Sequence, residues 1–144
     1  TQSRSSAASD VYKRQGYTYS AHPVGMAAVN ACVSETLRLD LKSNAAARGA
    51  QLYDGLKALQ SEFDIIGDVR GGHGLMAAIE LVSDRTTKAP LEMGTIKRVH
   101  KATYQAGTMV RIGGNNLLMS PPLILTDSDV GKILTDLRSG LSTI

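Results

Sequence analysis

The segment "MVRIGGNNLLMSPPL", residues 109–123, constrains the fold more than any other stretch of the chain. Two apolar runs flank Gly113 to Asn116, and glycine and asparagine tolerate the positive φ angles that tight hairpin turns require. Pro121 and Pro122 lack a backbone N–H, so they end strand pairing in the second arm. The segment therefore predicts an antiparallel hairpin, around which the chain must build a sheet.

A further strand is predicted over residues 75–82, "LMAAIELV", where the side chains on both faces are largely apolar. Such a pattern is typical of a central, buried strand. The preceding stretch "DIIGDVRGGHG", residues 64–74, is interpreted as a break and a turn. Its glycines precede a strand rather than a helix N-terminus, which disfavours a phosphate-binding loop.

Four helices are expected around these strands. The first starts at Pro23, and the second spans about 45–62, is capped by Asn44 and has Leu52, Leu56, Leu59 and Phe63 on one face. The third spans about 91–106 and ends at Gly107. The last follows a capping box formed by Thr126 and Asp129. Because helices and strands do not alternate regularly, we predict an α+β fold, a small antiparallel sheet covered by helices.

Charge and composition exclude several classes of function. The net charge is +3, and the first fifteen residues supply +2 of it, so the basic character is poor evidence for a nucleic-acid partner. The single cysteine, Cys32, excludes an internal disulfide and favours a cytoplasmic location. The three histidines lack metal-ligand spacing, so no metal site is expected. No apolar run reaches transmembrane length, so no membrane partner is expected either.

Residues 1–15, "TQSRSSAASDVYKRQ", show no periodicity and are typical of a disordered tail. The string "DVYKRQ" can also be encoded by a transposase-recognition sequence used in preparing sequencing libraries. We therefore interpret this tail as a translated adapter joined to a truncated gene, and exclude it from the fold. Residues 16–144 are expected to be a piece of a longer protein.

Three stretches in this part resemble successive landmarks of class III aminotransferases, which are pyridoxal-phosphate enzymes of fold type I. They are "GYTYSAHPVGMAA", "GDVRGGHGLMAAIELV" and "MVRIGGNNLLMSPPLILTDSDV", and the similarity is greatest to the ω-amino-acid:pyruvate group. One departure is "RGGHG", which is slightly longer than the family's usual form. The resemblance implies that residues 16–144 are the C-terminal segment and small domain of a homodimeric aminotransferase that uses pyridoxal 5'-phosphate.

The resemblance also implies roles for three residues. Thr18 would contact the cofactor phosphate of the neighbouring subunit, and Tyr17 would help to shape the cofactor pocket. The alternative for Thr18 is that it only caps the helix at Pro23. Arg111 would bind the substrate carboxylate, since a planar guanidinium can hold a carboxylate through two hydrogen bonds. The alternative for Arg111 is an ordinary surface residue on a strand.

The chain contains no counterpart of the family's Schiff-base lysine, so none of its residues is assigned a catalytic role. We expect the parent to be a transaminase that moves an amino group from an ω-amino acid or amine to pyruvate or a similar keto acid. The fragment alone is expected to be inactive, because the chemistry belongs to the cofactor. Two alternatives stay open: another class III enzyme such as an aminomutase or lyase, and a free-standing α+β ligand-binding module.

Overall fold

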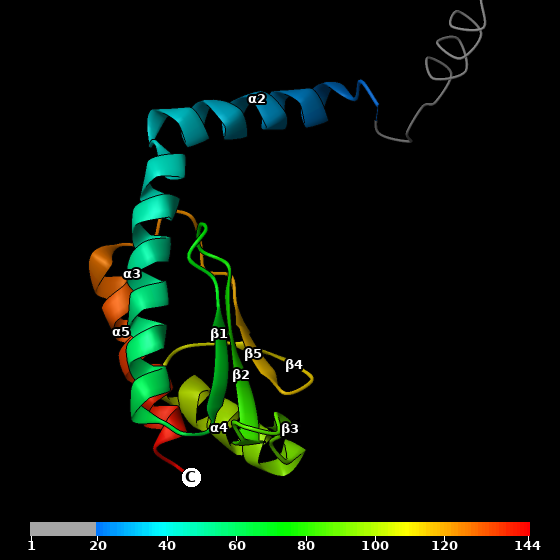
Figure 1. The fold of residues 1–144 in the computed structure, drawn as a ribbon. Coiled ribbons are helices and arrows are strands. Elements are labelled where there is room, and N and C mark those ends of the chain that lie inside the picture. Colours follow the sequence, from blue (N-terminus) through cyan, green and yellow to red (C-terminus); the bar gives the residue numbers. More distant parts are fainter. Residues whose placement is uncertain (1–19) are drawn as a thin grey trace, which may run out of the picture. The chain divides into compact units, whose positions relative to one another are not determined.

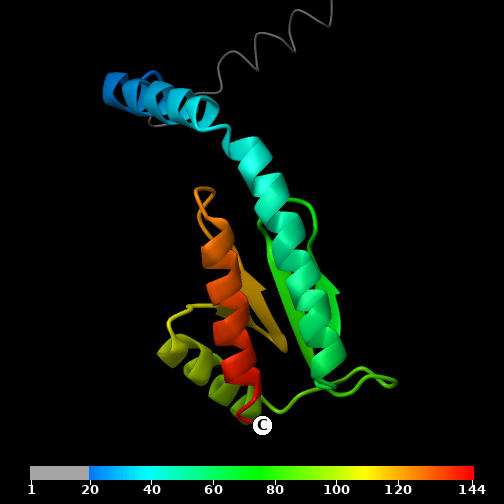
Figure 2. The same cartoon turned by 90° about the vertical axis from the view of Figure 1, so that its left-hand side faces the viewer.

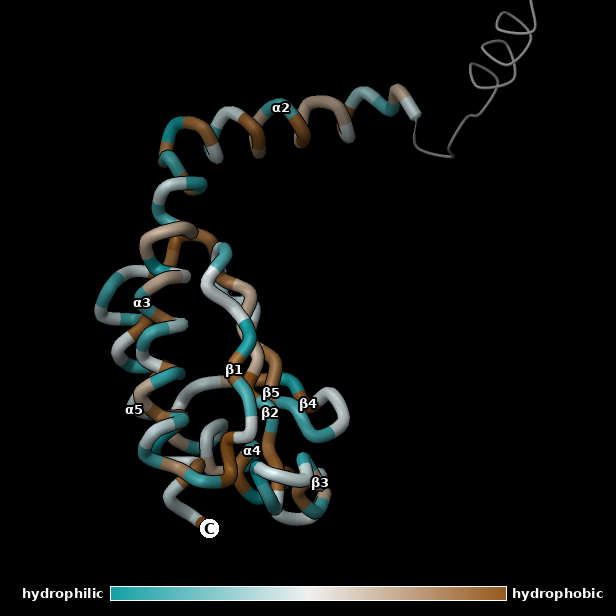
Figure 3. Tube along the Cα trace, viewed as in Figure 1, coloured by the Kyte–Doolittle hydropathy of each residue, from teal (hydrophilic) through white to brown (hydrophobic). Residues whose placement is uncertain are grey.

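The computed structural model describes residues 20–144, which fall into two parts, up to Leu39 and from Asp40 onward. The first part contains helix α2 (Pro23–Arg38), with proline at its start as predicted. His22 caps the helix, since its Nδ1 accepts a hydrogen bond from the Gly25 N–H at 3.3 Å. No residue of α2 is buried, although hydrophobic residues recur along it (Figure 3).

The second part combines three helices with a small sheet (Figure 1). Its elements are α3 (Leu41–Glu62), β1 (Ile66–Arg70), β2 (Ala77–Asp84), β3 (Ala89–Pro90), α4 (Met93–Ala106), β4 (Arg111–Gly113), β5 (Asn116–Met119) and α5 (Asp127–Leu141). The strand order is β1-β2-β5-β4, β3 pairs with β2, and every pair is antiparallel. The predicted α+β class is thereby confirmed.

The core lies between one face of the sheet and the helices. Helices α3 and α5 lie side by side over this face, and α4 packs against α5 and β4 (Figures 1 and 2). The largest fully buried side chains are all aliphatic: Leu52, Leu56, Leu59, Ile66, Ile79, Leu81, Ile96, Leu117, Leu137, Leu141, Val82 and Val99. Burial of this apolar surface is the main contribution that holds the sheet to the helices.

The predicted hairpin, the turn at "RGGHG" and the capping box are all confirmed. Strands β4 and β5 pair with Ile112 opposite Leu117, and the turn contains Gly114 at a φ of 62°. The stretch "RGGHG" forms the connection between β1 and β2, where Gly72 and Gly74 have positive φ angles of 88° and 71°. Thr126 and Asp129 form the predicted capping box of α5. The glycine cluster is therefore a turn, as predicted, and it connects two strands.

Two predictions about the elements are wrong. The break predicted at residues 64–74 hides strand β1, which contains Gly67 and Asp68, two residue types with low strand propensity. Pairing with β2 overrides that local preference. Helix α3 begins at Leu41, so Asn44 is not its cap; its Nδ2 instead donates to the backbone oxygens of Leu123 and Leu125 at 2.8 and 3.0 Å. Asn44 thus satisfies carbonyls of the loop between β5 and α5.

None of the helices in residues 20–144 combines the length and the apolar character needed to cross a membrane.

Candidate functional site

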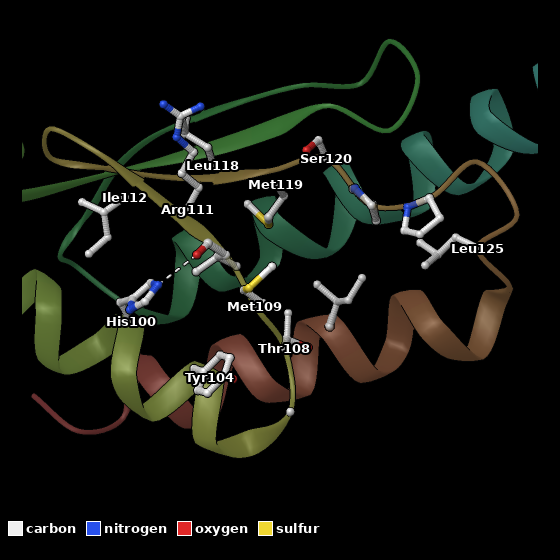
Figure 4. Close-up of a pocket in the computed structure, with 15 residues that line it drawn as sticks. His100, Tyr104, Thr108, Met109, Arg111, Ile112, Leu118, Met119, Ser120 and Leu125 are labelled. Atoms are coloured by element: carbon white, nitrogen blue, oxygen red, sulfur yellow. Dashed lines mark hydrogen bonds between the residues drawn. The ribbon is translucent and has the colours of Figure 1, made fainter. Parts of the chain in front are cut away.

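Two adjoining cavities lie beside the β4–β5 hairpin. The larger, about 980 Å³, is lined by residues of α4, the hairpin and the start of the loop to α5, including His100, Tyr104 and Pro121 (Figure 4). The smaller, about 320 Å³, is lined by Arg70, Met76 and Ala78 among others. Arg111, Leu118, Met119 and Ser120 line both. The hairpin therefore forms the wall between the two cavities, and Arg111 stands at their junction.

Arg111 is an exposed residue of the edge strand β4. Its guanidinium points away from the side of the hairpin on which His100 and Tyr104 lie (Figure 4). Within residues 20–144 it makes no hydrogen bond or ion pair. Every other arginine of this range has a side-chain or backbone partner: Arg38, Arg48, Arg70, Arg85, Arg98 and Arg138. The donors of Arg111 are thus available to an anionic ligand.

The strand register places a second arginine on the same face of the sheet. Arg70 lies opposite Ala78, Ala78 opposite Leu118, and Leu118 opposite Arg111. Directly paired residues of antiparallel strands share a face, so the four side chains form one row across the sheet. We call these four residues the arginine row. Arg70 was not predicted as a site residue, because its strand β1 was interpreted as a break.

Hydrogen bonds to side chains of α4 and α5 anchor the backbone segment that leads into β4. The Thr108 hydroxyl donates to Asp136 Oδ2 on α5 at 2.6 Å, and the Lys132 ammonium donates to the same oxygen at 2.7 Å. His100 Nε2 on α4 lies 2.9 Å from the backbone oxygen of Val110. Asp136 is buried, and it was also missed, although its (i, i+4) spacing from Lys132 is a signal for a helical ion pair. These contacts fix the segment that carries Arg111.

The Asp136 carboxyl has a pKa below its ordinary value of 3.8. Burial raises this pKa, but the hydrogen bonds from Lys132 and Thr108, together with the Lys132 charge, lower it by more. The carboxyl therefore binds a proton more weakly in the folded chain than in the unfolded one. Asp136 stabilises the fold at neutral pH, and this contribution disappears as the pH falls through the lowered pKa.

Substitution of Asp136 by asparagine is expected to lower the free energy of unfolding at pH 7 by about 1–3 kcal/mol, since two hydrogen bonds to a buried charge are weakened. The difference in the free energy of unfolding between the variant and the unsubstituted chain should shrink in strongly acid solution, because residue 136 is then neutral in both. Urea denaturation at a series of pH values measures this. Asp54→Asn on the exposed surface of α3 is the control and should change the free energy by less than about 0.5 kcal/mol. A pH-independent loss for Asp136→Asn would contradict the assignment.

Two predicted site residues cannot be compared with the structure. Thr18 and Tyr17 lie outside the described residues, so their predicted roles stay predictions. Among residues 20–144 no three histidine, cysteine, aspartate or glutamate side chains are grouped so that they could hold a metal ion. Neither cavity is lined by a lysine of this range. Lys88 donates to the backbone oxygen of Gly67 at 2.9 Å, and Lys132 is paired with Asp136.

Comparison with protein families gives a match to the model described as "Aminotransferase class-III" over residues 3–141. This range includes most of residues 1–15, which we interpreted as an adapter-derived tail, and sequencing of the genomic locus would decide between the two origins. The taurine–pyruvate aminotransferase of Bilophila wadsworthia is 34% identical over 142 residues, which cover 94% of this chain and 31% of that protein. The Arabidopsis thaliana alanine–glyoxylate aminotransferase 2 homolog 2 is 35% identical over 137 residues. These cover 92% of this chain and 28% of that protein.

Solved structures give the same similarity in three dimensions. The amine transaminase of an uncultivated Pseudomonas species, in its PLP-bound form, superposes with a TM-score of 0.85 at 39% identity. The match covers 90% of this chain and 30% of that one. An (S)-enantioselective omega-transaminase from Thermomicrobium roseum has a TM-score of 0.81 at 32% identity. The match covers 90% of this chain and 29% of that one. The chain thus spans about a third of the length of the proteins that it matches.

Proposed function

The chain belongs to the class-III aminotransferases, and we propose that it is the substrate-binding C-terminal part of a transaminase. The parent would transfer an amino group from an ω-amino acid or amine to pyruvate or a similar keto acid. The name of the Bilophila relative, a taurine–pyruvate aminotransferase, supports pyruvate as acceptor and an ω-amino acid as donor. We further propose that the parent is cytoplasmic and acts as a homodimer.

The observation that carries this proposal is the guanidinium of Arg111, unpartnered within residues 20–144, at the junction of the two cavities. A keto acid and an amino acid both present a carboxylate, and a guanidinium donates two parallel hydrogen bonds to such a group. An amine without a carboxylate offers no such partner. A guanidinium that is not tied to a neighbouring acid can turn aside for that substrate. Arg111 would therefore accommodate both kinds of substrate in alternate half-reactions.

Pyridoxal 5'-phosphate is the proposed cofactor, because the Pseudomonas transaminase is known in its PLP-bound form. When bound, this cofactor stabilises the carbanion that forms as the amino group is transferred. The described residues do not by themselves fit it, because none of their lysines lines a cavity. We propose that Thr18, with Tyr17 beside it, contacts the phosphate across a subunit interface. The task of the described residues is to hold and orient the substrate.

The test of this proposal is a comparison of the full-length protein with the isolated segment 16–144. With pyridoxal phosphate, an ω-amino acid and pyruvate, the full-length protein should form alanine at a rate proportional to enzyme concentration. The isolated segment should form none. Alanine production by the segment alone would contradict the assignment of the chemistry to the rest of the protein. Production of a rearranged or decarboxylated donor without alanine would instead indicate an aminomutase or a lyase.

A further inference from the structure

Strand β4, which carries Arg111, pairs with a neighbouring strand on one edge only. It lies at the end of the strand order β1-β2-β5-β4 and has three residues. His100 on α4 supplies a further hydrogen bond, because its Nε2 lies 2.9 Å from the backbone oxygen of Val110 (Figure 4). A carbonyl oxygen can only accept, so Nε2 carries the proton and donates. His100 therefore holds the peptide group that joins Val110 to Arg111.

Helix α5 holds the same segment two residues earlier in the chain. The Thr108 hydroxyl donates to the buried carboxylate of Asp136 at 2.6 Å. The Lys132 ammonium donates to the same carboxylate oxygen, and also to the backbone oxygen of Ala106, the last residue of α4, at 3.2 Å. One cluster on α5 therefore binds both the end of α4 and the start of the segment that leads to β4.

The backbone between α4 and β4 is also held by contacts of its own. The backbone N–H groups of Gly107 and Thr108 both donate to the backbone oxygen of Thr103 at 3.2 Å. The side chain of Val110 is buried in the core. The segment 107–110 is thus held by hydrogen bonds at its start and by burial and His100 at its end. The backbone at Arg111 therefore has little freedom to shift.

The side chain of Arg111 contrasts with its fixed backbone. It is exposed, and within residues 20–144 its guanidinium has no partner. His100 and Thr108, which we call the two anchors, lie on the opposite side of the hairpin from this guanidinium (Figure 4). The anchors therefore act on Arg111 through the backbone. A fixed backbone with a free side chain suits a group that binds a carboxylate in one half-reaction and turns aside in the other.

We propose that the two anchors, His100 and Thr108, are positioning residues for Arg111 and thereby contribute to the selectivity for substrates with a carboxylate. Asp136 takes part as the acceptor of the Thr108 hydroxyl. Without the anchors, binding of a carboxylate would also have to order the segment before β4, which weakens the binding. A substrate without a carboxylate does not use Arg111 and is not affected. This inference rests on the proposed role of Arg111.

The first test replaces Thr108 in the full-length holoprotein. Thr108→Val keeps the shape of the side chain and removes the hydroxyl. The KM for pyruvate, and the calorimetric Kd for the unreactive carboxylate propanoate, should both rise about threefold to tenfold. The kcat with pyruvate, and the KM for 2-aminobutane, which has no carboxylate, should stay within about twofold. Thr108→Ser retains the hydroxyl and should recover most of the loss.

The matched control is Thr135→Val on the exposed surface of α5. The Thr135 hydroxyl donates to the backbone oxygen of Gly131 in its own helix, at 2.9 Å. Its removal deletes a hydroxyl from the same helix without touching the segment before β4. All four constants, the two KM values, the Kd and kcat, should therefore stay unchanged.

The second test replaces His100 and is independent of the first. His100→Leu removes the donor, whereas His100→Gln places an amide N–H near the position of Nε2. The leucine variant should raise the KM for pyruvate and the Kd for propanoate about threefold to tenfold, and the glutamine variant should restore both. If Thr108→Val does not fold, this pair of variants decides alone. Equal effects of leucine and glutamine would overturn the inference.

A double variant shows whether the anchors act through Arg111. When Thr108→Val is added to Arg111→Ala, the KM for pyruvate and the Kd for propanoate should not rise further, because the side chain that Thr108 positions is already absent. A full additional rise, an equal loss for pyruvate and 2-aminobutane, or no loss in Thr108→Val overturns the inference. The proposed function is tested separately, because it is contradicted if Arg111→Ala alone weakens pyruvate and 2-aminobutane equally.

Discussion

Replacement of Arg111 by alanine in the full-length protein is expected to lower kcat/KM for keto acids about a hundredfold to a thousandfold. The substitution removes both hydrogen bonds and the charge that bind the substrate carboxylate, a loss of about 3–4 kcal/mol. For an amine that has no carboxylate, kcat/KM should stay within about threefold. Measurement of the two half-reactions separately, with each substrate class, resolves this difference.

The matched control for this prediction is Arg111→Lys. Lysine retains the positive charge but cannot donate two parallel hydrogen bonds, so the loss for keto acids should be intermediate. An equal loss for amines and keto acids in Arg111→Ala would refute the role assigned to this side chain. It would indicate that Arg111 supports the β4–β5 hairpin, and a lower Tm of the variant would accompany that result.

Replacement of Gly140 by alanine is expected to destabilise the second part of the chain by about 1–3 kcal/mol or more. Gly140 is buried on α5 where this helix meets α4. A Cβ atom there would lie 2.0 Å from Thr103 Oγ1 and 2.9 Å from the backbone oxygen of Val99. Because the Val99 oxygen belongs to the backbone of α4, the two helices would have to move apart. The free energy of unfolding in urea measures the effect.

Gly131 on the same helix is a matched control with the opposite expected sign. A Cβ atom at Gly131 would meet no other atom within 4 Å, and the residue is exposed. Gly131→Ala should therefore stabilise the chain by about 0.5–1 kcal/mol, because alanine loses less conformational entropy in a helix. A Gly140→Ala variant that is as stable as the unsubstituted chain, or more stable, would contradict close helix packing at Gly140.

Helix α4 and the β4–β5 hairpin show which features could be predicted from sequence. Ile96, Val99 and Thr103 recur at helical spacing, and all three are buried. Gly107 ends α4 at a φ of 123°, and Gly114 lies in the hairpin turn at a φ of 62°. These signals are local, since a helical stripe or a turn residue acts within a few positions of itself. Local signals therefore predicted these elements without knowledge of the fold.

Strand β1 shows why other features could not be predicted. Gly67 and Asp68 disfavour a strand locally, and only the pairing of Val69 with Ile79 and Arg70 with Ala78 makes the segment one. The role of Asn44 likewise depends on a loop about eighty residues further along the chain. Such contacts are absent from any short window of sequence, so propensity alone predicts a break and a helix cap instead.

The sequence by itself determined the hairpin and the capping box, because each depends on residues close together in the chain. The order of the expected elements predicted the α+β class, and the resemblance to class III aminotransferases made Arg111 a candidate. The tertiary structure alone decided that Arg70 and Arg111 share one row, through the strand order β1-β2-β5-β4. It also decided that Asp136 holds the segment before β4 through Thr108. The physical reason is that strand register and helix packing bring together side chains some thirty to forty residues apart, and neither is encoded in any one segment.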